Sequence, residues 1–280
     1  MHRLVSTDWL AAHIDRQDVV IIDATWFMPG TPRDARAEYV ERHIPGAVFF
    51  DIDQVSDHNT DLPHMLASPA DFAVVARRLG VDATSTVVVY DGVGLFSAPR
   101  VWWNFRVMGH AAAAVLDGGL PKWLAEGRAI ESGWREPQHG DFKSHPDENL
   151  VRSLDQVSEA LARRSAQIVD ARPAARFAGE APEPRPNLRS GHMPGAHSLP
   201  FSDLVAADGR LRSPEEIRAM FAAAGVDLAV PIVTTCGSGV SAAVLALALA
   251  TVGRPDVAVY DGSWSEWGAR TDTPVAVGPA

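Results

Sequence analysis

The chain has 280 residues, 46% of them hydrophobic and 21% charged, which is ordinary for a globular protein with one large or two medium domains. Its formal net charge of −10 disfavours a nucleic-acid partner, because binding a phosphate backbone requires a basic face. A single cysteine excludes an internal disulfide, and the most apolar run, residues 242–252, is too short to span a membrane.

From the N-terminus, residues 1–17 lack the apolar core of a signal peptide, so we expect a cytoplasmic protein without a membrane partner. Short β-branched runs then alternate with helical stretches. In chain order we predict a strand at 19–22, a helix at 69–80, strands at 86–90 and 166–169, a helix at 213–225, a strand at 231–235, a buried helix at 242–252 and a strand at 257–260. This alternation predicts an α/β fold with mainly parallel sheets and helices on both faces.

Five short motifs occur twice in the same order, 144–149 residues apart. For example, RHIPGAVFF at 42–50 resembles GHMPGAHSL at 191–199. We therefore predict two tandem copies of one domain, at residues 1–130 and 151–280, joined by a polar linker at 131–150. Because both copies contain the H-[IM]-P-G-A motif, we expect it to serve the fold, its Pro-Gly pair forming a turn.

The two copies differ at one strand-to-helix turn, where Asp91 in the first is replaced by Cys236 in the second, 145 residues later. Ligands of open α/β sheets bind at the carboxyl ends of strands, where Cys236 lies. The amides of residues 237–241 can line a cradle there, and the following helix directs its positive end at the sulfur. Such a setting favours the nucleophilic thiolate, so we predict that Cys236 is a catalytic nucleophile.

Three other interpretations of this turn are weaker. GSGVSA at 237–242, with Asp261 downstream, fits a dinucleotide-binding pattern, but only 44 residues follow Cys236, too few for a complete nucleotide-binding half. A cysteine phosphatase requires an arginine six residues after the thiolate to hold phosphate, and position 242 is alanine. A serine-hydrolase elbow around Ser238 requires glycine at position 236.

The tandem layout, the duplicated H-[IM]-P-G-A motif and the Asp91/Cys236 pair resemble the rhodanese-like sulfurtransferases over nearly the whole chain. Members that use thiosulfate have basic residues after the cysteine, whereas the uncharged loop CGSGVS is similar to that of the 3-mercaptopyruvate sulfurtransferases. The resemblance implies a transferase that passes sulfur from 3-mercaptopyruvate through a Cys236 persulfide to cyanide or a thiol such as thioredoxin, and releases pyruvate. It implies no metal or organic cofactor. A thiosulfate:cyanide sulfurtransferase and a non-catalytic regulatory module remain the alternatives.

The resemblance also implies which residues bind the substrate. The segment ARFAGEAPEPRP supplies Arg176 and Arg185, which would hold the carboxylate and keto oxygen of the substrate, since a guanidinium pairs bidentately with a carboxylate. Arg172 and Arg189 are nearby competitors with a lower rank. Further contacts are expected from the turn, at Gly237, Gly239, Val240 and Ser241.

A serine–histidine–aspartate relay is the last implied feature, formed here by Ser238, His64 and Asp53. His64 has Gly209 as its counterpart 145 residues later, so the histidine is unique to one copy, which favours a function over a structural role. Asp51 and His58 are the alternatives in the same stretch.

Overall fold

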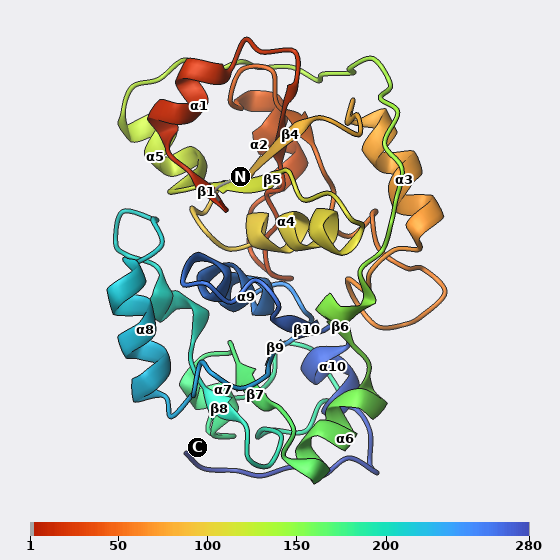
Figure 1. Ribbon diagram of the computed structural model, residues 1–280, viewed down its shortest axis with the longest axis vertical. Coiled ribbons are helices and arrows are strands. Elements are labelled where there is room, and N and C mark those ends of the chain that lie inside the picture. Colours follow the sequence, from red (N-terminus) through yellow and green to blue (C-terminus); the bar gives the residue numbers. More distant parts are fainter. Residues whose placement is uncertain (1–2, 280) are drawn as a thin grey trace. The chain divides into compact units, whose positions relative to one another are not determined.

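A computed structural model describes residues 3–279 and divides into two compact units (Figure 1). Unit 1 comprises the chain as far as Asp57, together with Leu66–Asp147 and Ala206–Leu211. Unit 2 comprises His58–Met65, Glu148–Val205 and the chain from Arg212 onward. Each unit thus follows one sequence repeat, except that each includes one short segment of the other repeat. We call His58–Met65 and Ala206–Leu211 the exchanged segments.

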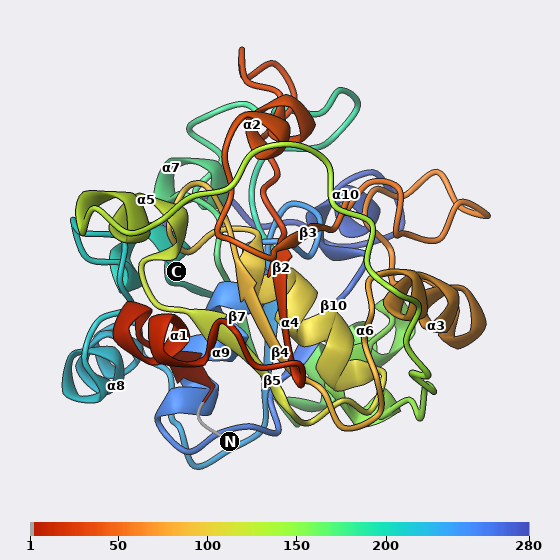
Figure 2. The same cartoon turned by 90° about the horizontal axis from the view of Figure 1, so that it is seen from above.

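Unit 1 is built around a five-stranded sheet. Its strands are β1 (Leu4–Val5), β2 (Val19–Asp23), β3 (Val48–Phe49), β4 (Thr86–Tyr90) and β5 (Ala113–Leu116), and its helices are α1 (Thr7–His13), α2 (Ala35–Glu41), α3 (Pro69–Arg78), α4 (Ala98–Val107) and α5 (Gly119–Ala125). The strand order is β1-β5-β4-β2-β3 and every pairing is parallel. Leu10 of α1 and Trp123 of α5 join Val88 in one core cluster, and α1 and α5 lie on the same side of this sheet in both views (Figures 1 and 2).

Unit 2 repeats this arrangement. Its strands are β6 (Val151–Arg152), β7 (Gln167–Asp170), β8 (His197–Ser198), β9 (Ile232–Thr235) and β10 (Ala258–Tyr260). Its helices are α6 (Leu154–Arg163), α7 (Ala174–Phe177), α8 (Pro214–Ala223), α9 (Ala242–Thr251) and α10 (Ser263–Trp267), with 3-10 turns η1 (Glu148–Leu150) and η2 (Phe201–Leu204). The order is β6-β10-β9-β7-β8, all parallel, which is the order of unit 1 with each strand replaced by its counterpart. The predicted α/β class is therefore confirmed.

The helix predicted at 242–252 is α9, whose residues from Ala242 to Leu249 are at most 3% exposed. Its length of ten residues, all-round apolar surface and burial identify it as a core helix. Within residues 3–279, no helix is long and apolar enough to cross a membrane.

The polar segment between the repeats packs on unit 1 as far as Asp147. Its single phenylalanine, Phe142, is 1% exposed and lies edge-on to the rings of Phe72 and Phe105. Arg77 Nη1 donates to the Phe142 carbonyl at 3.1 Å. One buried aromatic side chain therefore fastens a segment whose composition is otherwise that of a loop.

Candidate active site

Cys236 follows the last residue of β9 and precedes the turn into α9. The four residues of β9 are buried, as expected for a central strand of a parallel sheet, and Cys236 itself is 2% exposed. The structure thus places the thiol at the carboxyl end of a strand and beside a helix N-terminus, where the sequence predicts it.

Helix α10 fixes the backbone of this turn from one side. Ser263 Oγ accepts a hydrogen bond from Cys236 N at 3.2 Å, and Trp264 N donates to the Cys236 carbonyl at 2.9 Å. Ser265 donates to the Gly237 carbonyl through both N and Oγ, at 2.8 and 2.7 Å. Sequence reasoning missed Ser263, although its place in the repeated motif DGSW was a signal. Its backbone is left-handed, with a φ of 50°, where its unit 1 counterpart is Gly119 with a φ of 55°.

In the equivalent turn of unit 1, backbone N–H groups point toward the side chain of Asp91, the counterpart of Cys236. The Asp91 carboxylate accepts hydrogen bonds at 2.8–3.0 Å from the five backbone N–H groups of Val93, Gly94, Phe96, Ser97 and Ala98. A side chain in this position therefore lies in a cradle of donors at the start of α4, a natural binding place for negative charge. The counterparts of these donors, 145 residues later, are Ser238, Gly239, Ser241, Ala242 and Ala243.

Two guanidinium groups converge on the turn of unit 2. Arg176, in α7, and Arg185, in the proline-rich loop that follows, both approach Gly237. A Cβ atom placed on Gly237 would lie 3.2 Å from Arg176 Nη2 and 4.0 Å from Arg185 Nη1. The structure thus brings both predicted arginines next to the residue that follows the thiol.

The two competing arginines have other contacts. Arg172 is 1% exposed and pairs with Asp170, its Nη2 lying 2.6 Å from Oδ2. Arg189 donates to the backbone carbonyls of Trp267, Gly268 and Thr273. Both side chains hold parts of the fold together, in agreement with their lower rank.

Glu183 is a further charged residue at this place that sequence reasoning missed. Its side chain is 2% exposed and bridges Arg172 and Arg176. The signal was present, because Glu183 stands in the same Glu-Pro-Arg segment that supplies Arg185, but a glutamate in a proline-rich loop is usually exposed.

His64 comes from the exchanged segment His58–Met65 and so belongs to unit 2 with Ser238. His64 Nδ1 and Ser238 Oγ are 3.0 Å apart, and the two residues are 6% and 5% exposed. Asp53 belongs to unit 1, where its Oδ2 accepts a hydrogen bond from Trp26 Nε1 at 3.0 Å. The alternative Asp51 accepts hydrogen bonds from the backbone N–H groups of Asp53 and Gln54, as a turn-forming aspartate does.

The histidines of the duplicated motif are held by the fold. His43 is stacked on Tyr39 and bonds to its carbonyl through Nδ1 at 2.8 Å. His192 is stacked on Phe177 and bonds to the Phe177 carbonyl in the same way, at 2.9 Å. These matching contacts agree with the expected structural role. No group of three or more His, Cys, Asp or Glu side chains within residues 3–279 could hold a metal ion.

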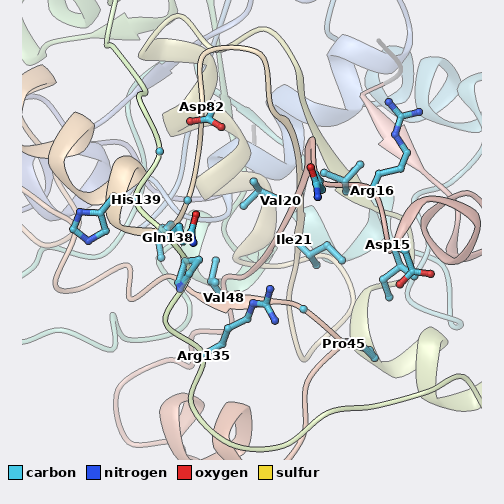
Figure 3. Close-up of a pocket in the computed structure, with 18 residues that line it drawn as sticks. Asp15, Arg16, Val20, Ile21, Pro45, Val48, Asp82, Arg135, Gln138 and His139 are labelled. Atoms are coloured by element: carbon cyan, nitrogen blue, oxygen red, sulfur yellow. The ribbon is translucent and has the colours of Figure 1, made fainter.

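A hollow of about 700 Å³ in unit 1 lies near the amino-terminal end of β2 (Figure 3). Val20 and Ile21 line it from β2, and Arg135 and Gln138 from the segment after the first repeat. A hollow of about 590 Å³ at the equivalent place in unit 2 is lined by counterparts of the same strand start and Pro-Gly turn, among them Ala166, Gln167, Pro194 and Gly195. Because the hollow recurs in both copies, we attribute it to the fold.

Comparison with known proteins agrees with this geometry. The model of the rhodanese-like domain matches residues 6–126 and 153–270. The 3-mercaptopyruvate sulfurtransferase of Escherichia coli (strain K12) is 48% identical over 272 residues, covering 97% of this chain and 96% of that protein. The thiosulfate sulfurtransferase of Bos taurus is 46% identical over 271 residues, covering 94% and 91%.

The fold is similar to that of a solved relative. The crystal structure of SseA from Escherichia coli matches with a TM-score of 0.87 and 45% sequence identity, over 94% of this chain and 99% of that one. Matched domains that span both repeats, the shared fold and the identity over nearly the full length lead to one conclusion: this chain belongs to the rhodanese-like family and contains two tandem copies of its domain.

Proposed function

We propose that this protein is a 3-mercaptopyruvate sulfurtransferase, which transfers sulfur from 3-mercaptopyruvate to a thiol or cyanide through a persulfide on Cys236. The observation that carries the proposal is the convergence of Arg176 and Arg185 on Gly237, beside the thiol. A 2-oxo acid presents a carboxylate and a neighbouring carbonyl oxygen, and two planar guanidinium groups match that pair of acceptors. The turn itself has no charged side chain to attract an inorganic dianion.

The first half-reaction forms the persulfide. The Cys236 thiolate attacks the substrate sulfur, the carbon–sulfur bond breaks, and its electron pair leaves with the three-carbon fragment as the enolate of pyruvate. The proton of the substrate thiol ends on the methylene carbon of that enolate, so the products are pyruvate and a negatively charged persulfide. Arg176 and Arg185 stabilise the charge that develops on the enolate oxygen.

Proton movement in this step belongs to Ser238 and His64. Their 3.0 Å contact lets the serine hydroxyl exchange a proton with the imidazole while it faces the substrate sulfur. We assign Asp53 as the third member, which would keep His64 in the tautomer needed for this exchange. Within unit 1 the Asp53 carboxylate also accepts a hydrogen bond from Trp26 Nε1.

The turn amides hold the persulfide. If they converge on Cys236 as their counterparts converge on Asp91, then Ser238, Gly239 and Ser241 to Ala243 present N–H groups to the outer sulfur. Gly237 and Val240 complete the turn. A charge held by several preorganised amides requires no reorganisation at the moment of transfer.

In the second half-reaction an acceptor thiolate, or cyanide, attacks the outer sulfur and Cys236 leaves as the thiolate. With thioredoxin or a small thiol the acceptor becomes the persulfide, and with cyanide it becomes thiocyanate. We infer a cytoplasmic location, because a lone reactive thiol on a fold without disulfides suits a reducing compartment.

Thiosulfate:cyanide sulfurtransfer is the second candidate, favoured by the 46% identity to the bovine thiosulfate enzyme. Intact-mass measurement separates the candidates. We expect the protein mixed with 3-mercaptopyruvate, without acceptor, to gain one sulfur atom and release one equivalent of pyruvate, and Cys236→Ser to do neither. Gain of sulfur from thiosulfate only would favour the second candidate. No gain from either donor would contradict a transferase function altogether.

A further inference from the structure

Unit 2 contains a series of four side chains of alternating charge that are linked by ion pairs. Three of the four are buried, and none of those three takes part in the proposed reaction. Asp170, Arg172 and Glu183 have side chains that are 1%, 1% and 2% exposed. Arg172 binds Asp170 through Nε and Nη2 and binds Glu183 Oε1 through Nη1 at 2.7 Å. Burial alone would lower the pKa of Arg172, but the two carboxylates outweigh it and raise that pKa.

The fourth charge is Arg176, which is 17% exposed and lies at the substrate end of the series. Its guanidinium donates two hydrogen bonds to the Glu183 carboxylate, from Nε to Oε1 at 3.3 Å and from Nη2 to Oε2. The same Nη2 lies beside Gly237. No residue in the described part of the chain accepts a hydrogen bond from Arg176 Nη1, so this edge of the guanidinium remains available for a ligand.

Arg172 holds the Glu183 carboxylate in place while Glu183 also contacts Arg176. Besides the two carboxylates, Arg172 donates to the Gly191 carbonyl at 2.8 Å, and its guanidinium lies 4.2 Å from the centre of the Trp264 ring. Trp264 is the residue whose N–H holds the Cys236 carbonyl. The carboxylate that orients Arg176 is therefore anchored to the same helix that fixes the nucleophile.

The fold does not require these ion pairs, as the other repeat demonstrates. The counterpart of Asp170 is Asp23, and the counterpart of Arg172 is Thr25, each 147 residues earlier. Thr25 supplies only hydrogen bonds to Asp23 Oδ1, from N and Oγ1 at 2.9 and 2.5 Å. The same sheet thus forms without the arginine, and among the described residues this series of ion pairs occurs only in unit 2, which contains the thiol.

From these contacts we propose that Glu183 is a positioning residue: it aligns the Arg176 guanidinium so that Nη1 faces the carboxylate of the bound 2-oxo acid. This inference rests on the proposed function. An arginine–carboxylate contact is present in both the bound substrate and the transition state, so its misalignment weakens binding more than it slows the chemical step.

Glu183→Gln tests the proposal, because glutamine keeps the shape but turns an amide N–H₂ group toward an arginine. We expect the KM for 3-mercaptopyruvate to rise about tenfold or more, with kcat within about threefold of the parent. Glu180→Gln is the matched control, since Glu180 lies in the same loop, is exposed and loses the same charge. Its KM should equal that of the parent protein.

The direction of the KM change is decisive. Removing one negative charge near Arg176 would, without any positioning effect, strengthen the binding of an anion and lower KM. A KM that falls, or that matches the Glu180→Gln control, overturns the proposal. A fall in kcat alone, with parental KM, also overturns it, because that is the signature of lost folded protein.

Glu183→Asp provides the second variant, in case the glutamine protein does not fold by circular dichroism. It keeps the charge but is one methylene shorter, so it draws the guanidinium back from Gly237 and should raise KM by a smaller factor. An unchanged KM in a folded Glu183→Asp protein contradicts the proposal. Absence of pyruvate release by the parent protein would refute the proposed function instead, so the two failures are distinguishable.

Discussion

His64 and Gly209 occupy equivalent positions of the two repeats and share a left-handed backbone, with φ angles of 62° and 79°. Glycine adopts this conformation freely, whereas a residue with a Cβ atom loses about 1 kcal/mol in it. The strain at His64 nevertheless places Nδ1 within 3.0 Å of Ser238 Oγ. Strain retained at one position of one repeat points to a chemical role for the imidazole.

His64→Gly gives this position the residue that the other repeat has. We expect 3-mercaptopyruvate turnover to fall about a hundredfold, because proton transfer loses its partner, while stability falls by no more than about 2 kcal/mol, because relief of the backbone strain offsets part of the lost packing. Thiosulfate turnover should fall by less than about threefold, since that donor has no thiol proton to transfer. Steady-state assays with both donors, with exposed His58→Gly as the control, measure the ratio. Equal losses with both donors would exclude His64 from the proton relay.

At the scale of elements, the strand–turn–helix unit occurs twice with different contents. After β4 the turn closes around its own carboxylate, Asp91, whereas after β9 the side chain in this position is a thiol. The first turn is therefore a self-contained structural unit in which five amides already have their acceptor.

Asp91→Asn should destabilise unit 1 by about 2–4 kcal/mol, because the amide has one accepting oxygen in place of two, so at least two of the five N–H groups lose their acceptor and face an N–H₂ group instead. Urea unfolding followed by circular dichroism measures the change. Asp15→Asn, which removes an exposed carboxylate of the same unit, provides the comparison. A loss below about 1 kcal/mol would indicate that the turn does not depend on this carboxylate.

Elements with a local signal could be predicted from the sequence. The helices predicted at 69–80 and 213–225 begin at Pro69 and Pro214, and the serine before each proline accepts a hydrogen bond from a backbone N–H group of the first turn. The strand expected at 86–90 is β4 without change. Ser263 and Glu183 stand in recognisable motifs, but the motifs do not reveal their roles, because the hydrogen-bond and ion-pair partners of these side chains depend on how distant segments pack.

At the scale of the whole molecule, the repeats also differ in how they handle a buried aspartate. Asp170 is neutralised by Arg172, whereas burial of Asp23, without a cation at Thr25, raises the pKa of Asp23 to about 6. The native protein then binds this proton more tightly than the unfolded chain. Protonated Asp23 therefore adds to the free energy of unfolding. This contribution is at its full size below about pH 4, decreases as the pH rises to about 6 and is absent at higher pH.

Asp23→Asn should abolish this dependence and make the protein more stable than the parent above about pH 6, by up to about 3 kcal/mol. Asp170→Asn, at the equivalent position of unit 2, should make the protein less stable than the parent, because it leaves Arg172 buried without one of its two carboxylates. Urea unfolding between pH 4 and pH 7 measures both variants. A parental slope retained in Asp23→Asn would assign the pH dependence to another group.

The exchanged segments could not be predicted, because nothing in residues 58–65 or 206–211 indicates which unit each will join. Because of these segments, the two sequence repeats and the two compact units do not have the same boundaries. The thiol is encoded in one repeat and the histidine that reaches its loop in the other, so a single repeat inherited alone would hold one of them but never both. If His64 and Cys236 act together as proposed, a protein that contains either repeat alone lacks the activity, even if that repeat folds. The two repeats then act as one functional unit, in which the second supplies the cysteine and the first supplies the histidine.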